Sequence, residues 1–331
     1  MTFFTLRPAT PADLPAAVAL FNRASRAVTG RDDVTLEEQR TEWSDPILSL
    51  RDDTRVAVTP DGAMIGCVEV WNSAPFVQAW VLGRVEPSLR GQGIGTALMA
   101  WAEERVRARI AQAPPDARVV MRASALASDE PGVALLRGAG FQPVRHFWTM
   151  RRELDTPPPA PVWPAGIVVR GMQPGEEPAM LRADIDAFRD HYGFVERPFE
   201  DEFARWQHHV AGDPYFDPSL YFLAWDGDQI AGICLCAART TDDPESGWVY
   251  SLGVRRPWRR RGLGMALLYH AFGELRARGC RRVGLGVDAS SLTGATRLYE
   301  RAGMHSFRER IHFEKELRPG TELATTALAA E

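Results

Sequence analysis

The feature that most constrains the fold of this chain is an internal repeat. The 331 residues contain two stretches that begin alike, one at Arg7 and the other at Arg170. Near the end of each stretch stands an Ala-Gly pair, and its glycines, Gly140 and Gly303, have the same separation as the two opening arginines. Because chance matches would not return to the same offset, the two halves are copies of one fold.

A Gly-rich segment lies inside each copy, at Arg90–Gly95 and at Arg259–Gly264, and the separation of these two segments is slightly larger. The second copy therefore carries about six extra residues before its segment, and the first copy carries about six after its own. Insertions of this kind are tolerated in loops. Between the copies, residues 156–164 are dense in proline, which is typical of a stiff, extended linker that cannot join a sheet.

These boundaries predict four parts: an N-terminal domain at 1–155, a Pro-rich linker at 156–164, a second domain at 165–318 and a flexible tail at 319–331. Within each copy the pattern predicts strand, helix, helix, three strands, helix, strand, helix and strand. In the second copy, Asp226-Gly227-Asp228 is a hairpin signal between two strands, and Gly279 ends a helix that we expect at 265–278. We expect further strands at 248–254 and 282–287, and a helix at 293–301. The fold class is α/β, with two tandem domains that each have a central mixed β-sheet flanked by helices.

Composition excludes several classes of protein. The net charge of −4 gives no global attraction to nucleic acid or to anionic membranes. No apolar run approaches the roughly 18 residues of a membrane span, and the first residues lack the layout of a signal peptide. We therefore expect a cytoplasmic protein. The four cysteines are too few for a disulfide framework. Cys234 and Cys236 fall in an apolar run, where we expect them on opposite faces of a strand, as buried free thiols and with no metal.

The Gly-rich segments each fall between a predicted strand and a predicted helix. Glycine lets the backbone approach a ligand closely, and the N-terminus of the following helix presents unpaired N–H groups that suit a phosphate. An ordinary strand–helix turn would explain one such segment, but two copies with an arginine at the same spacing favour a phosphate site. A Rossmann site would follow the first strand, and a Walker loop is excluded because Lys315 is the only lysine. Trp258, inside the Arg cluster, leaves base stacking by a nucleic-acid site as a weaker alternative.

These residues resemble the GNAT superfamily of N-acetyltransferases, including its tandem two-domain members. In that superfamily an Arg/Gln-x-x-Gly-x-Gly/Ala loop binds the pyrophosphate of CoA through backbone N–H groups, and residues 295–304 are similar to its closing motif. The resemblance implies acetyl-CoA as cofactor and covers nearly the whole chain. The residues it assigns to CoA are Arg90, Gly91, Gly93 and Gly95 in the first copy and Arg259, Arg260, Arg261, Gly262, Leu263 and Gly264 in the second.

One difference between the two copies indicates which of them is catalytic. In many members of the resembled family a tyrosine at the position of Tyr299 protonates the departing thiolate. Alignment of Gly140 with Gly303 places Leu136 opposite Tyr299, and leucine cannot donate a proton. A tyrosine that merely packs against the sheet is the alternative. We therefore predict that the C-terminal domain is catalytic and the N-terminal domain is not.

The remaining site residues follow from the same resemblance. The backbone of Leu252, Gly253 and Val254 is expected to bind pantetheine, freed from the sheet by a splayed strand or a bulge. Ser291 holds a slot where much of the family has an asparagine. The acceptor wall is expected to include Asp190, His191, Tyr192 and Tyr250. The general base stays open between Tyr250, Ser251, Glu245 and a water chain.

The sequence thus predicts an N-acetyltransferase, monomeric or homodimeric, that transfers an acetyl group from acetyl-CoA to a primary amine by direct attack in a ternary complex. The amine belongs to a small molecule or a peptide, and neither nucleic acid nor membrane is a partner. The alternative is a non-catalytic acyl-CoA-binding regulatory protein.

Overall fold

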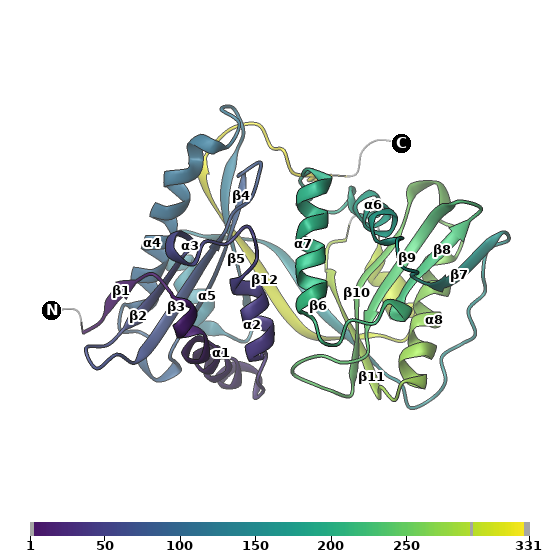
Figure 1. Cartoon of the computed structure of the whole chain (residues 1–331), viewed down its shortest axis with the longest axis horizontal. Helices are drawn as coiled ribbons and strands as arrows, with labels where there is room; N and C mark the ends of the chain where they lie inside the picture. The colour runs from purple at the N-terminus through teal and green to yellow at the C-terminus, as the bar shows by residue number, and fades with distance from the viewer. Residues whose placement is uncertain (1–2, 292–293, 328–331) are drawn as a thin grey trace. The chain divides into compact units, whose positions relative to one another are not determined.

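The chain forms two compact units in the computed structural model, which describes residues 3–291 and 294–327. The first unit contains the described residues of Met1–His146, Arg205–Asp213 and Arg310–Leu323. The second contains those of Phe147–Ala204, Pro214–Glu309 and Ala324–Glu331. Each unit is an α/β fold with a mixed sheet between helices, as the sequence predicts (Figure 1).

The sheet of the first unit has the strand order β1-β2-β3-β4-β5-β12, in which only β4 and β5 run parallel. Its strands are β1 (Thr5–Arg7), β2 (Thr54–Val58), β3 (Met64–Trp71), β4 (Gln78–Val85), β5 (Val119–Leu126) and part of β12 (His305–Arg318). Its helices are α1 (Leu14–Thr29), α2 (Leu36–Trp43), α3 (Leu50–Asp53), α4 (Ile94–Arg109) and α5 (Glu130–Gly138). Helices α1 and α4 pack against β3 and β4.

The second unit repeats this plan with the order β7-β8-β9-β10-β11-β6, in which β10 and β11 are the parallel pair. Its strands are β7 (Ile167–Gly171), β8 (Tyr221–Asp226), β9 (Gln229–Ala237), β10 (Ser246–Val254), β11 (Arg282–Asp288) and part of β6 (Gln142–Glu153). Its helices are α6 (Glu177–Phe188), α7 (Phe199–Gly212), α8 (Leu263–Ala277) and α9 (Ala295–Arg301). Residues 205–212 of α7 belong to the first unit.

These elements match the predicted hairpin, strands and helices of the second copy to within two residues at each described end. Gly279 adopts a positive φ of 90° just after α8, as expected for a helix stop. The predicted start of the last helix at Thr293 lies outside the described residues. No helix that the structure describes is long and apolar enough to cross a membrane.

The two sequence copies exchange their last strands. Strand β12, from the end of the second copy, pairs antiparallel with β5 of the first unit, from Arg310 opposite Leu126 onward (Figure 1). Strand β6, from the end of the first copy, pairs antiparallel with β11 in the second unit. The compact units therefore differ from the predicted ranges 1–155 and 165–318 at the final strand of each copy, and also at Arg205–Asp213. An exchanged strand covers the edge that β5 or β11 would otherwise expose.

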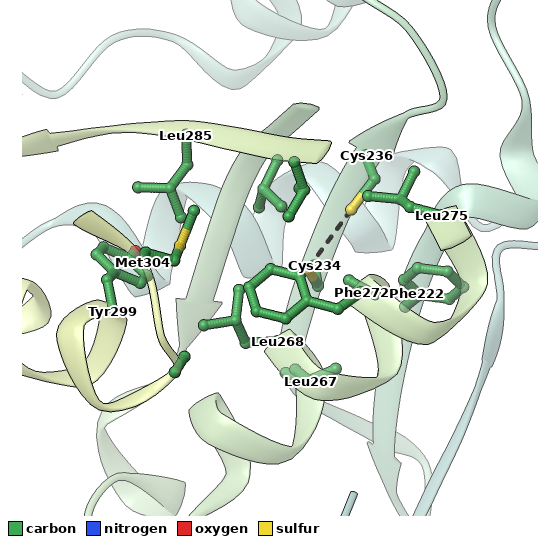
Figure 2. Packing of buried hydrophobic residues seen from close by; sticks show 14 of the residues in the cluster. Phe222, Cys234, Cys236, Leu267, Leu268, Phe272, Leu275, Leu285, Tyr299 and Met304 are labelled. Carbon is green, nitrogen blue, oxygen red and sulfur yellow. Dashed lines mark hydrogen bonds between the residues drawn. The ribbon is translucent and has the colours of Figure 1, made fainter. Parts of the chain in front are cut away.

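The core of the second unit lies between the sheet and α8. Figure 2 shows Phe272 and Leu268 of α8 packed among buried side chains of the strands and of α9. Cys234 and Cys236 point into this same core with their Sγ atoms 3.7 Å apart. The expectation that they face opposite sides was wrong, because side chains two residues apart on a strand share a face. All four cysteines are buried free thiols, as expected.

Strand β12 gives a direct test of the exchange. Phe313 is 0 % exposed in the core of the first unit, whereas Phe307, on the same strand, is 42 % exposed. We expect Phe313→Ala to lower the free energy of unfolding by about 3–5 kcal/mol, because it empties a packed site. The matched Phe307→Ala substitution should cost less than about 1 kcal/mol. Urea unfolding followed by tryptophan fluorescence measures both, and equal losses would contradict the burial of Phe313 in this core.

Candidate active site

In both units the parallel strand pair opens partway along its length. Strands β4 and β5 pair from Gln78 to Trp80, and the described residues of β4 beyond Trp80 make no ladder pair with β5. Strands β10 and β11 pair from Ser246 to Val249 and likewise separate beyond that point. The backbone groups at the open edges need other partners, so each gap is suited to an extended polar ligand.

Strand β10 also contains the irregularity that the sequence analysis anticipated. Its register with β9 shifts between Val249 and Ser251, which leaves Tyr250 as the extra residue of a β-bulge. Leu252, Gly253 and Val254 then pair with β9 on one side only, so their other edge faces the opening. The corresponding strand β4 pairs with β3 without a register shift. The bulge is therefore a feature of the C-terminal copy.

The two Gly-rich loops have the same backbone conformation. Gly91 and Gly93 have φ of 79° and 84°, and Arg260 and Gly262 have φ of 59° and 84°. Helix α4 starts directly after Gly93 and α8 directly after Gly262, so the first N–H groups of both helices point out of the helix end. Arg260 takes at a small conformational cost the left-handed geometry that Gly91 adopts freely.

The last glycine of each loop lies in a close contact between helices. A Cβ at Gly95 would lie 2.8 Å from Leu135 of α5, and one at Gly264 would lie 3.3 Å from Leu298 of α9. Tight packing at this point brings the start of the loop helix against the helix that follows β5 or β11. In the second unit this neighbouring helix is α9, which also contains Tyr299.

Asp190 braces the loop of the C-terminal copy. Its carboxylate accepts hydrogen bonds from Arg256 (Nε, 2.9 Å) and from Arg259 (Nη1, 2.5 Å). These partners, Arg256 first, lower the pKa of Asp190 to about 2. Arg259 also donates to the carbonyls of Val254 and Ala187, so its guanidinium is fixed by protein groups. Arg261 is exposed at the same corner, where it can reach a phosphate.

Tyr299 lies on α9 with its side chain 8 % exposed, beside Met304 and Leu285 (Figure 2). Burial raises the pKa of its phenol well above the usual value, so the group is protonated at neutral pH. Leu136 is buried at the corresponding place in the first unit. The difference between the copies therefore persists in three dimensions.

The other predicted residues of the second unit lie on several sides of the opening. The His191 ring packs against Phe188 at a tilt of 53°, with 4.3 Å between ring centroids, and burial lowers the pKa of its imidazole. Tyr192 is half-buried on the same loop, and Tyr250 is 60 % exposed. The Oγ of Ser291 accepts a hydrogen bond from the Ala295 N–H (3.3 Å) and so caps α9.

The described residues also bear on two other kinds of site, a nucleic-acid site at Trp258 and a metal site. Trp258 is buried and its indole N–H donates to Asp226 (2.7 Å), so the ring is not available to stack on a base. In the part of the chain that the structure describes, no three His, Cys, Asp or Glu side chains are grouped to hold a metal.

The first unit contains a cavity of about 560 Å³ at its own opening. The backbone of Gly83–Val85 lines one wall, and the loop residues Arg90, Gly91 and Gly93 line the end. Leu136 reaches it from α5. Arg90 bonds Asp129 across the mouth (3.0 Å). The cavity lies where the resemblance to the family places CoA. The sequence predicted the Gly-rich loop but could not predict the volume of the cavity beside it.

The loop between α6 and α7 is held by the chain's C-terminal segment. Gly193 N–H donates to the Thr325 carbonyl (2.8 Å), Thr325 N–H donates to the Phe194 carbonyl (2.8 Å), and Thr325 Oγ1 donates to the Arg189 carbonyl (3.0 Å). The sequence analysis predicted a flexible tail here. Backbone pairing of this kind leaves no side-chain pattern from which it could be found.

The fold and the openings define a class of protein: an acyl-CoA-dependent transferase with two copies of a sheet that splays beside a helix N-terminus. The Acetyltransferase (GNAT) family model matches residues 17–126 and 181–304, and the chain belongs to this family. It is an acetyl-CoA-dependent acyltransferase.

Similar proteins extend along the whole chain. A mycothiol acetyltransferase of Geodermatophilus obscurus is 34% identical over 301 residues, which cover 88% of this chain and 91% of that protein. One from Thermobispora bispora is 36% identical over 225 residues, covering 66% and 70%. The crystal structure of a GCN5-related N-acetyltransferase from Sphaerobacter thermophilus has a TM-score of 0.80 and 39% identity, covering 98% of this chain and 99% of that one. A tandem GNAT protein from the clavulanic acid pathway shares the fold, with a TM-score of 0.70, 19% identity and coverage of 96% and 100%.

The contacts of Thr325 predict an effect of truncation. We expect removal of residues 324–331 to speed hydrogen exchange at the Gly193 amide, because its acceptor is lost. Removal of residues 328–331 alone keeps Thr325 and should leave that amide protected. Hydrogen-exchange mass spectrometry of the peptide that contains Gly193 and Phe194 measures the difference. Equal protection in both truncated proteins would show that Thr325 does not hold this loop.

Proposed function

We propose that the C-terminal copy transfers the acetyl group of acetyl-CoA to a primary amine by direct attack in a ternary complex. The observation that carries this proposal is the buried, protonated Tyr299 beside the splayed and bulged strand β10, where the other copy has Leu136. In this reaction the proton donor helps to expel the thiolate, and the open backbone edge holds the thioester.

In this proposal the α8 N-terminus and Arg261 bind the pyrophosphate. The free backbone edge of Leu252–Val254 binds pantetheine, and its N–H groups stabilise the oxyanion that forms as the amine attacks. Tyr299 then protonates the departing sulfur. The burial that raises the pKa of the phenol also raises the pKa of a thiol formed beside it, so proton transfer stays balanced.

We further propose that the N-terminal copy binds CoA without chemistry. Its loop has the backbone geometry of the other, and its cavity of about 560 Å³ leads from the loop along β4. Leu136 offers no proton at the point where Tyr299 stands in the second copy.

The acceptor is an amine of a small molecule or a peptide. The relatives named mycothiol acetyltransferase, and the similarity of the two-copy layout to mycothiol synthase, make the unacetylated amine precursor of mycothiol the first acceptor to test. Asp190 contributes little to recognition of a cationic amine, because its charge is neutralised by Arg256 and Arg259.

A non-catalytic acyl-CoA-binding regulator is the second candidate. For the N-terminal copy it is favoured by Leu136, which cannot donate a proton where the second copy has Tyr299. The two candidates differ in turnover. A regulator would bind CoA and release no thiol with any amine.

Substitution of Tyr299 tests the catalytic assignment. We expect amine-dependent release of CoA thiol to fall at least about tenfold in Tyr299→Phe, because a general acid is lost without loss of packing. Tyr269→Phe on α8 is the matched control and should keep wild-type turnover. A thiol-reactive dye measures release across a panel of amines that includes the mycothiol precursor. An unchanged rate in Tyr299→Phe would argue against its role as the acid.

Substitution of the loop glycines separates the two copies. A valine at Gly93 or Gly262 strains a positive φ at the phosphate site. We expect calorimetry to find two CoA molecules per wild-type chain and one in either variant, and only Gly262→Val should abolish acetyl transfer. Gly62→Val strains a similar turn away from both loops and should keep both sites. Loss of transfer in Gly93→Val alone would move the chemistry to the N-terminal copy.

A further inference from the structure

A serine and an aspartate meet on the side of β10 that faces α6. Ser251 Oγ donates a hydrogen bond to Asp184 Oδ1 over 2.5 Å. Ser251 directly follows the bulge, and the next residue, Leu252, begins the open backbone edge. A hydroxyl at this position therefore lies next to the place where the thioester carbonyl is expected.

The packing of α6 on β10 fixes this pair. A Cβ at Gly253 would lie 2.7 Å from the Cβ of Ala187, so helix and strand are in close contact there. Asp184 stands about one turn before Ala187 on α6, and Ser251 stands two residues before Gly253 on β10. Both pairs thus lie along the same line of contact, and the helix cannot move away without opening the interface.

Asp184 differs from the other acids of α6 and the loop that follows it. Asp186 pairs with Arg255, and Asp190 pairs with Arg256 and Arg259, so their charges are neutralised by cations. In the described chain the hydrogen-bond partner of Asp184 is the neutral Ser251 hydroxyl. Burial raises the pKa of this carboxyl to about 6, while the hydroxyl opposes the rise. A carboxylate in this range accepts protons near neutral pH.

The same positions in the N-terminal copy carry no such groups. At the separation of the two Gly-rich segments Ser251 corresponds to Leu82, and at the separation of the two opening arginines Asp184 corresponds to Phe21. Glu245, another candidate base, is paired with Arg281 (3.2 Å) and Arg282 (3.5 Å) at the far end of β10. The relay groups and Tyr299 therefore occur in the same copy.

We propose that Ser251 and Asp184 form the proton relay that deprotonates the acceptor amine. Ser251 is the catalytic residue, and Asp184 is the residue that positions the Ser251 hydroxyl and accepts its proton. The proposal rests on the transferase function assigned above to the C-terminal copy. Ser251 donates its proton to Asp184, so its oxygen lone pairs are free to accept a hydrogen from the substrate nitrogen.

The protons and bonds balance over one turnover. The ammonium gives a proton to Ser251 Oγ as the Ser251 proton passes to Asp184. The neutral nitrogen then forms the N–C bond and the C–S bond breaks. The sulfur takes the Tyr299 proton, and the second proton from nitrogen restores Tyr299. Asp184 releases its proton to water, so that one proton leaves for each ammonium acetylated.

Three variants of the full-length protein test the relay: Ser251→Ala, Asp184→Asn and the double variant. We expect kcat at pH 7 to fall about 100-fold in each, and the double variant to be no worse than the singles, because the groups act as one unit. The deficit should shrink toward pH 10, where solvent deprotonates the amine. Ser246→Ala, on the same strand, and Glu177→Gln, at the start of α6, are the controls and should keep wild-type kcat.

Two further measurements separate chemistry from structure. CoA affinity by calorimetry should stay within twofold of wild type in all three variants. Asp184→Asn should raise Tm at pH 8, because the raised pKa of the buried carboxyl destabilises the folded protein increasingly between the usual value of 3.8 and about 6. The gain should therefore decrease as the pH is lowered through this range.

The outcomes distinguish this proposal from the function on which it rests. If wild-type protein releases no CoA thiol with any amine, the transferase assignment fails. If wild type is active and both single variants stay within threefold of its kcat at pH 7, the relay is wrong. A lowered Tm at pH 8, together with a deficit that does not vary with pH, would show that the pair is only a structural contact between α6 and β10.

Discussion

The early separation of two parallel strands is the constraint around which each copy is built. A sheet normally satisfies its backbone groups strand against strand, and an opening leaves N–H and C=O groups that cost free energy until a ligand pairs with them. In the second unit the bulge at Tyr250 turns the edge of Leu252–Val254 toward that opening. The helix N-terminus at Leu263 stands at one end of the gap, so one extended ligand can satisfy both sets of groups.

The two copies share the backbone frame of this opening. Gly262 and Gly93 have the same φ of 84°, and the last loop glycine packs against a leucine of the next helix in both units. The copies differ at positions to which the proposed transfer assigns proton movement: tyrosine against leucine on the helix after the splayed pair, and serine against leucine on the splayed strand. Under that proposal the same backbone frame serves both copies, and these side chains decide which of them carries out chemistry.

How much of this could be predicted from the sequence depends on the range of the interaction. The loop conformation, the hairpin at Asp226-Gly227-Asp228 and the end of α8 at Gly279 follow from local turn chemistry, and they were found. The partners of Asp190 were not, because ion pairs to Arg256 and Arg259 join residues about 66 positions apart with no spacing rule. The hydrogen bond between Ser251 and Asp184 was missed for the same reason, although both elements were predicted.

The exchange of last strands makes each copy depend on the other for its fold. Residues 142–153 and 305–318 have similar patterns of buried and exposed side chains, so this pattern alone does not indicate which sheet each strand joins. Once β12 pairs with β5 and β6 pairs with β11, each sheet loses an edge strand if the other copy is removed. Loss of β12 would leave the backbone edge of β5 unpaired and would remove Phe313 from the core of the first unit. The N-terminal copy therefore supplies part of the fold of the C-terminal copy, whether or not its own cavity holds CoA.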